Sequence, residues 1–340
     1  MLRRKLEASA PAASQRGRLR CSCSDVSPPT ATTDLAMLRR KLEASAPAAA
    51  QRGRLPAHFT DAWLASVLSK PHRTPAITAT KLTRALQARA EAGADELFGP
   101  APAALPAPGV PREITSAAIA ERCSLLRPML EPVAAKCGAE LDCGSMYWHG
   151  FDRQGRPLLW VRPARKGWRG MDRRREVLAH VALLEAGLSE LLLPRGVLQF
   201  ALVADARGLG LSTFDPSLMR SLLKLMMSTY PERVGKIYIG PVNVLVKAVH
   251  KVLSPLLPDA VKSKIVLMDA PAAQLLEAID APHVPHFFGG AAAHEFSDGA
   301  AEGRPGGGFD LAYMLAWQML LKENADCCRA RAHNETPARR

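Results

Sequence analysis

The second half of the chain alternates short apolar segments with amphipathic ones, and this alternation limits the fold more than any other feature. Residues 197–204 (VLQFALVA) form a nearly continuous apolar run of strand length, which is typical of a strand covered on both faces of a sheet. Shorter runs of this kind at 236–239 and 264–268 enclose an apolar helical segment at 244–257, and a last helix is predicted at 272–279. Strands that alternate with helices in this way predict an α/β fold with a mainly parallel sheet.

Local signals add further elements on either side of this alternation. Residues 147–162 fit a hairpin with a turn at 152–155. Asp172 is placed to cap a helix that runs to Leu188, and Pro216 is placed to start another. Helical spacing of apolar side chains is also found upstream, at 58–68, 77–97 and 114–137.

These elements divide the chain into four parts. Residues 1–57 form an N-terminal segment discussed below. A helical lobe is expected over residues 58–137, with a Pro/Ala-rich linker at 99–111, and a sheet-containing domain over residues 138–290. Residues 291–340 are expected to be a C-terminal tail with one helix near 309–323.

The N-terminal segment contains a duplication. Residues 1–19 recur at 37–55 with a single change. Two polar copies are too few for a stacked repeat fold, so a recent duplication, or a gene model whose true start is Met37, explains them better. The segment is rich in Arg, Ala and Ser and poor in acids, as organelle transit peptides are, and it is equally compatible with a disordered tail. We therefore expect no packed structure over residues 1–57, and plastid or mitochondrial import stands as an alternative to a cytoplasmic location.

The charge balance favours anionic partners. The 340 residues include 45 Lys and Arg against 32 Asp and Glu, a formal net charge of +13. Nucleic acid, acidic lipid headgroups and phosphorylated ligands all fit such an excess. Aromatic residues are only 5% and form no stacking pattern among the basic runs, so a nucleic-acid partner is not expected. No apolar run reaches the roughly 20 residues that span a bilayer.

Motifs of catalysis and metal binding do not emerge from the sequence. Residues 208–213 (GLGLST) follow a strand as a dinucleotide loop does, but the third glycine is replaced and Pro216 intervenes before the helix, which favours a plain turn. No nucleophile elbow or phosphate loop occurs. The seven cysteines are scattered, which favours free thiols in a reducing compartment and no zinc site. The chain is predicted not to be an enzyme and to need no metal or cofactor.

One stretch of about sixty residues joins several of these pieces in a specific order. Residues 230–290 begin with Tyr-Pro-Glu-Arg, continue through the strand at 236–239, the apolar helix at 244–257 and Ser-Lys-Ile at 263–265, and end with Phe-Phe-Gly-Gly. This order resembles the C-terminal half of CRAL-TRIO lipid-binding domains, the fold of phosphatidylinositol, tocopherol and retinaldehyde carriers. Residues 82–89 (LTRALQAR) are similar to the helical box that precedes these domains, without its Phe and one Arg.

The resemblance implies a headgroup site. In the phosphatidylinositol-binding branch, the positions that match Glu232 and Lys264 contact the inositol ring, and the position that matches Arg89 contacts phosphate. Val261 and residues 240–243 depart from the pattern of that branch. A lipid ligand is therefore supported more strongly than phosphatidylinositol itself, and structural ion pairs are the alternative role for the three charged residues.

The resemblance also implies a CRAL-TRIO fold, in which the sheet is the floor of an apolar lipid cavity that helices cover, preceded by a small helical lobe. The helix at 244–257 matches the gate that covers the cavity, and an ordinary buried helix is the alternative. An acyl chain gains about 0.8 kcal/mol per methylene on leaving water, so a carrier needs such an enclosure. The residues expected to line the cavity and gate are Phe200, Leu202, Ile237, Ile239, Val246, Val249, Leu253 and Ile265.

The densest run of cations, at 162–175, is a candidate surface for an acidic membrane, since each cation near such a surface contributes about 1 kcal/mol. A solvated loop and helix start is the alternative. The residues expected to dock are Arg162, Arg165, Lys166, Trp168, Arg169 and Arg173.

Together these features predict a monomeric, peripheral lipid-binding or lipid-transfer protein. Its expected ligand is a phospholipid, a phosphoinositide or another small hydrophobic molecule, and its expected surface partner is an acidic membrane. A regulatory module that uses the same fold without transferring lipid is the first alternative. A nucleotide-dependent enzyme is the weaker one.

Overall fold

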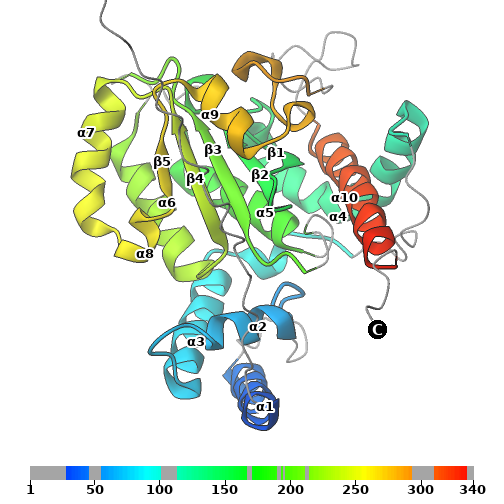
Figure 1. Cartoon of the computed structure of the whole chain (residues 1–340), viewed down its shortest axis with the longest axis vertical. Helices are drawn as coiled ribbons and strands as arrows, with labels where there is room; N and C mark the ends of the chain where they lie inside the picture. Colours follow the sequence, from blue (N-terminus) through cyan, green and yellow to red (C-terminus); the bar gives the residue numbers. More distant parts are fainter. Residues whose placement is uncertain are drawn as a thin grey trace, which may run out of the picture.

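The computed structural model describes residues 28–45, 55–100, 113–166, 171–189, 193, 196–210, 214–292 and 310–334. In this part of the chain, a five-stranded sheet is surrounded by helices, and a small group of helices lies below it in Figure 1. No helix among the described residues is both long and apolar enough to cross a membrane.

The sheet confirms the predicted α/β class. Its strands lie side by side in the order in which they occur in the chain, and every neighbouring pair is parallel except the first, which is an antiparallel hairpin. The strands are β1 (Met146–Phe151), β2 (Pro157–Val161), β3 (Phe200–Asp205), β4 (Val234–Gly240) and β5 (Ile265–Leu267).

The connecting helices begin where the sequence predicts. Asp172 accepts backbone hydrogen bonds from the first turn of α5 (Arg173–Leu188), and Asp215 does the same for α6 (Pro216–Thr229), which has proline at its first position. The shorter elements that complete this half are α7 (Val244–Leu253), η5 (Ser254–Leu256), α8 (Asp259–Lys262), α9 (Pro271–Ala278), η6 (Ala281–His283) and η7 (His286–Phe288).

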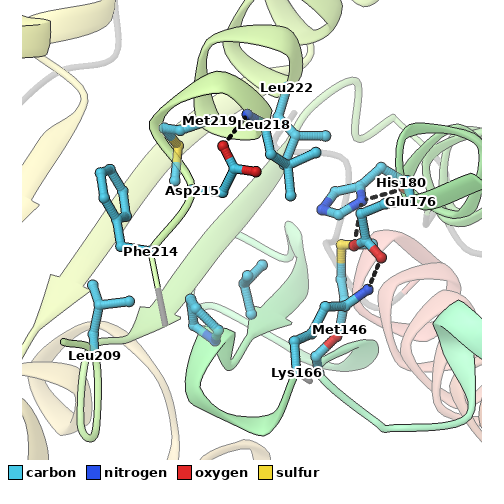
Figure 2. Close-up of a pocket in the computed structure, with 13 residues that line it drawn as sticks. Met146, Lys166, Glu176, His180, Leu209, Phe214, Asp215, Leu218, Met219 and Leu222 are labelled. Carbon is cyan, nitrogen blue, oxygen red and sulfur yellow. Dashed lines mark hydrogen bonds and ion pairs between the residues drawn. The ribbon is translucent and has the colours of Figure 1, made fainter. Parts of the chain in front are cut away.

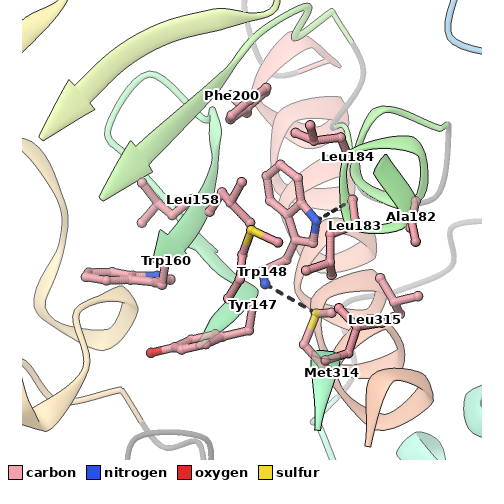
Figure 3. Packing of buried hydrophobic residues seen from close by; sticks show 14 of the residues in the cluster. Tyr147, Trp148, Leu158, Trp160, Ala182, Leu183, Leu184, Phe200, Met314 and Leu315 are labelled. Carbon is pink, nitrogen blue, oxygen red and sulfur yellow. Dashed lines mark hydrogen bonds between the residues drawn. The ribbon is translucent and has the colours of Figure 1, made fainter. Parts of the chain in front are cut away.

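The main core forms between the sheet and α5. The fully buried indole of Trp148 on β1 donates from Nε1 to the carbonyl of Leu183 at 2.8 Å, and the ring of Phe200 meets it edge-on at 5.3 Å (Figure 3). Gly187 allows this packing, because a Cβ there would lie 2.0 Å from the Trp148 ring. The hydrogen bond satisfies the one polar atom of the indole inside an apolar core.

The C-terminal helix belongs to this core, which corrects the expectation of a tail. Helix α10 (Leu311–Asn334) packs against β1 and α4 (Ser116–Leu141), and Met314 and Leu315 are fully buried. Gln318 fixes its position, because the side-chain amide donates to the carbonyl of Gly150 and accepts from its amide. The helix is also longer than the expected 309–323.

The expected helical lobe is divided between two cores. Helices α2 (Asp61–Leu68) and α3 (Pro75–Glu91) share a separate apolar core, whereas α4 packs against α5 and α10 beside the sheet. A short turn, η2 (Ala94–Glu96), follows α3, and most of the predicted linker lies outside the described residues.

The N-terminal segment also differs from the expectation. Part of it forms helix α1 (Pro28–Ser45), which packs against α2 and α3 and buries Leu38 and Leu42 completely. We use the term helical lobe below for α1, α2 and α3. The helix forms because its apolar side chains recur at a spacing of four and find a partner surface, which composition alone did not reveal.

Candidate functional site

Glu232 lies at the junction between the helical lobe and the sheet. It occupies the turn between α6 and β4 with a left-handed backbone φ of 62°. One carboxylate oxygen accepts hydrogen bonds from Arg73 Nη2 and Lys81 Nζ, each at 3.2 Å, and both donors belong to the helical-lobe side. The carboxylate therefore ties two lobe cations to the start of a central strand.

Lys264 lies in the same charged region, at the start of β5. Its ammonium donates to the carbonyl of Val234 at 2.8 Å. Burial lowers the pKa of Lys264, and the charges of Lys70 and Lys81 lower it further, while Glu232 opposes them. The pKa of Glu232 falls below its ordinary value although burial alone would raise it, because Lys81, Lys264 and Arg73 surround it.

The structure thus brings two of the three predicted headgroup residues together. We call Lys70, Arg73, Lys81, Lys264 and Glu232 the cation cluster. It contains four cationic side chains and one carboxylate, so its field favours an anion even with Glu232 ionised. Sequence reasoning missed the lobe cations, because they are more than 150 residues from Glu232 in the chain and belong to no recognisable motif.

Arg89 lies in a different network. Its guanidinium makes a paired contact with the carboxylate of Glu185 on α5, at 2.8 and 2.9 Å, and also contacts Asp95. The hydroxyl of Tyr230 donates to the same Glu185 carboxylate at 2.8 Å. Burial, together with Glu185, raises the pKa of that tyrosine. Arg89 is only 8% exposed, so in this structure its charge is occupied by protein carboxylates.

Arg233, next to Glu232, holds the lobe to the sheet and was not predicted. Its guanidinium stacks 4.0 Å from the ring centre of Trp63, donates to the carbonyl of Leu198 at 3.0 Å and donates to the carbonyl of His58. Burial lowers the pKa of Arg233 to about 9, opposed by Glu185. In the Pro-Glu-Arg turn, the side chain of Glu232 therefore lies in the cation cluster, and that of Arg233 contacts the helical lobe.

One face of the sheet is apolar and only partly covered. Leu202 on β3 pairs in register with Ile237 on β4, which pairs with Ile265 on β5. Ile239 lies two residues farther along the same face. All four side chains are half-buried, whereas Val203 and Tyr238 on the opposite face are buried. Phe200, the fifth strand residue predicted for the cavity, is completely buried against Trp148.

Helix α7 bears its apolar side chains with little cover. Asn243 caps it by accepting from the amide of Val246 at 2.8 Å. Val246 is buried, and Val249 and Leu253 are half-buried, but Val252 is 69% exposed. Val244, the first residue of the helix, is 85% exposed, so the outward face of α7 also carries apolar side chains.

A pocket of about 70 Å³ lies between the sheet edge, α5 and α6. One wall is polar (Figure 2), because the buried Glu176 carboxylate accepts from Lys166, and His180 Nδ1 donates to the carbonyl of Glu176 at 2.8 Å. Burial raises the pKa of Glu176 and lowers that of His180 to about 4. The other walls are mostly apolar and include Met146, Val161, Leu209, Phe214, Leu218, Met219 and Leu222. A lipid-sized ligand needs several hundred Å³, so this void does not hold one as it stands.

The predicted membrane-docking run is corrected in part. Lys166 is buried in its pair with Glu176, and Arg162 lies over the ring of Phe287 at 3.9 Å with its side chain 14% exposed. Charges so well covered do not reach a membrane surface. Arg165 is half-buried, and its Nε donates to the carbonyl of Cys143. Arg173 is exposed and pairs with Asp215, and Trp168 and Arg169 lie outside the described residues.

Among the described residues, no group of three or more His, Cys, Asp or Glu side chains is placed to hold a metal ion. What the described residues offer is an α/β sheet with a partly covered apolar face, flanked at the start of its strands by a cation cluster.

The comparison with protein families agrees with this architecture. Residues 141–290 match the model of the CRAL/TRIO domain. Residues 141–290 are therefore similar to a CRAL/TRIO domain, as the order of motifs in residues 230–290 predicts.

Two relatives illustrate the relationship. The chain is 32% identical over 162 residues to the phosphatidylinositol/phosphatidylcholine transfer protein SFH7 of Arabidopsis thaliana, a match that covers 42% of this chain and 29% of the relative. It is 25% identical over 168 residues to the phosphatidylinositol transfer protein CSR1 of Eremothecium gossypii, covering 48% and 38%. The matches thus span well under half the length of these relatives.

A solved structure shows the same fold. The crystal structure of Sfh5 matches with a TM-score of 0.51 and 12% sequence identity, over 80% of this chain and 91% of that chain. By their names, SFH7 and CSR1 are lipid-transfer proteins, which supports lipid binding in general terms.

Proposed function

We propose that this protein holds one phospholipid and transfers it between membranes, with the acyl chains against the apolar sheet face and an anionic headgroup at the cation cluster. The observation that supports the proposal is the adjacency of the two regions in the chain. Glu232 lies two residues before β4, and Lys264 immediately precedes β5, while Ile237 and Ile265 begin the apolar face on the same strands. One ligand with a charged end and an apolar body fits both.

The apolar end provides the binding energy. Each methylene that leaves water contributes about 0.8 kcal/mol, so a chain of about sixteen carbons would gain roughly 12 kcal/mol if fully enclosed. The half-buried face of Leu202, Ile237 and Ile265 offers part of that enclosure. The pocket between α5 and α6 is only about 70 Å³, so we propose that loading requires a cover to move.

Helix α7 with η5, within the segment 244–257, is the cover we propose. Val246 is the one buried side chain of α7, so displacing the helix disrupts less packing than displacing a fully buried helix would. Such a helix exchanges contacts with the sheet for contacts with acyl chains or with a membrane, all of which are apolar. We propose that it opens at the membrane and closes over the bound lipid.

The charged end selects the headgroup. In the structure described, Glu232 accepts from Arg73 and Lys81. A phosphate competes well for such donors, because charge-assisted hydrogen bonds to its oxygens are short and strong. Glu232 would then accept hydrogen bonds from headgroup hydroxyls. The names of the relatives include phosphatidylinositol, whose headgroup supplies both phosphate and hydroxyl groups.

The first experiment identifies the ligand. The purified full-length protein is extracted, and the lipid that co-purifies is identified and counted by mass spectrometry. We expect close to one phospholipid per chain. Transfer of labelled phosphatidylinositol and phosphatidylcholine from donor to acceptor vesicles is then measured. Bound lipid without transfer would favour the regulatory module, and absence of any bound or transferred lipid would contradict the proposal.

The second experiment tests the headgroup site. Lys264→Ala removes a charge-assisted contact worth about 1.5–3 kcal/mol, so transfer of phosphatidylinositol should fall by about tenfold or more. Lys262→Ala is the matched control, because Lys262 lies two residues earlier and pairs at the surface with Asp259. Equal transfer by both variants would show that the cation cluster does not contact the headgroup.

A further inference from the structure

Helix α1 packs against α2 and α3 through a few side chains. Leu38 and Leu42 are completely buried in the core that α2 and α3 share. Arg39 adds polar contacts, because its guanidinium pairs with Asp61 at 2.7 Å and donates to the carbonyl of Phe59 at 3.3 Å. We call the surface of α2 and α3 that receives these side chains the lobe groove.

Three of the contact residues, Leu38, Arg39 and Leu42, occur twice in the chain, whereas Leu35, which packs against the same core, precedes the repeated stretch. Residues 37–49 are identical to residues 1–13, so Leu2, Arg3 and Leu6 repeat Leu38, Arg39 and Leu42 in the same order and spacing. Recognition by the lobe groove depends on side chains that recur at i, i+1 and i+4. A surface that accepts one copy has the chemistry to accept the other.

We propose that the first copy, residues 1–9, is a second ligand of the lobe groove and exchanges with residues 37–45. The copy that occupies the groove in this structure has the shorter connection to it. About 10 residues link this copy to Leu55, at the edge of the same core, whereas about 46 residues link the first copy to Leu55. Loop-closure entropy favours the nearer copy by about tenfold, so the first copy is the minor occupant.

The exchange has a consequence for the rest of the molecule. Helix α3 carries Lys81 and Arg89, which contact Glu232 and Glu185 in the sheet half. Because the lobe groove is built partly from α3, loss of its occupant would loosen these contacts. A second copy in reserve keeps α3 in place when the first-choice segment leaves. This inference rests on the packing of α1 and does not depend on the proposed lipid function.

Charge substitution in the full chain tests the exchange. Leu38→Asp with Leu42→Asp evicts the nearer copy, and Leu2→Asp with Leu6→Asp disables the distant one. Protection of α2 and α3 amides against hydrogen exchange is the readout. We expect no change for the distant pair alone, a loss of about tenfold for the nearer pair alone, and a much larger loss when all four are replaced. The control is Arg40→Asp with Ala44→Asp, two exposed positions of the same helix.

Photo-crosslinking identifies the occupant directly. With photo-reactive leucine incorporated, tryptic peptides from the two copies differ in mass, because Ser14 in the first copy stands where Ala50 is found in the second. Crosslinks from α2 or α3 to the first copy, enriched in the variant with Asp at 38 and 42, support the proposal. If such crosslinks occur only in dimers, the occupant comes from a second chain, which still assigns the groove to the first copy. The proposal would be overturned if no crosslinks to the first copy were found and if the nearer-pair and fourfold variants lost the same hydrogen-exchange protection of α2 and α3.

Discussion

Arg89→Ala should destabilise the fold rather than act mainly on a ligand. Arg89 and Glu185 are each less than a tenth exposed and share two hydrogen bonds of 2.8 and 2.9 Å. Removing the guanidinium leaves the Glu185 charge buried with only Tyr230 as a donor among the contacts described above. Breaking a buried pair in this way costs about 3–5 kcal/mol, a large part of the roughly 5–15 kcal/mol that typically stabilises a folded domain.

The free energy of unfolding, measured by urea titration, checks this magnitude. Arg84→Ala is the control, since Arg84 is exposed on the same helix and should cost less than about 0.5 kcal/mol. Arg89→Met combined with Glu185→Gln removes both charges and keeps an acceptor for Tyr230, so it should recover at least half of the loss. If Arg89→Ala lost less than about 1 kcal/mol while phosphatidylinositol transfer collapsed, Arg89 would be a headgroup residue and the structural interpretation would be wrong.

Three further outcomes are expected. Burial lowers the pKa of His180 to about 4 in the fold, against about 6.5 in the unfolded chain, so the unfolded chain binds more protons between these two pH values. The free energy of unfolding should therefore fall by about 3 kcal/mol from pH 6.5 to pH 4. In urea titrations at each pH, His180→Gln should flatten this dependence. Gly187→Ala should cost about 3 kcal/mol by the same titration, because its methyl group would overlap the Trp148 ring, whereas Gly210→Ala, with open space around the new methyl group, should be nearly neutral. Co-sedimentation with phosphatidylserine vesicles should weaken as salt rises, because surface charges are screened beyond about 8–10 Å at physiological ionic strength; binding that ignores salt would exclude electrostatic recruitment.

The sequence was a good guide where local pattern determines structure. Strand-length apolar runs, the cap at Asp172 and the helix start at Pro216 are read from neighbouring residues, and the structure has strands and helix starts at these places. It was a poor guide to which helices pack together. Helix α10 reads as a tail helix, yet Met314 lies at the centre of the core, because only the folded chain brings it against β1.

The same limit applies to charged residues. A run of cations such as Arg162 to Arg173 looks like one surface, but the side chains point to different partners. Lys166 forms an ion pair with Glu176, whereas Arg162 stacks on the ring of Phe287 and pairs with Asp205. Conversely, Arg73 and Lys81 have no signature in the sequence and meet Glu232 only because α3 packs beside α6. Long-range ion pairs carry no periodicity, so one sequence cannot predict them.

The location of the cation cluster has a thermodynamic consequence if the proposed function holds. Two of its cations, Arg73 and Lys81, come from the lobe side, whereas Lys264 and Glu232 belong to the sheet half. A headgroup that contacts both halves binds only the docked arrangement, so it stabilises that arrangement by RT ln(1 + [L]/Kd), about 2.7 kcal/mol at a ligand concentration one hundred times Kd. By the same linkage, anything that loosens the lobe weakens lipid binding by the same factor. Lobe packing and headgroup affinity are therefore a single coupled equilibrium, in which the occupant of the lobe groove influences the lipid site through α3.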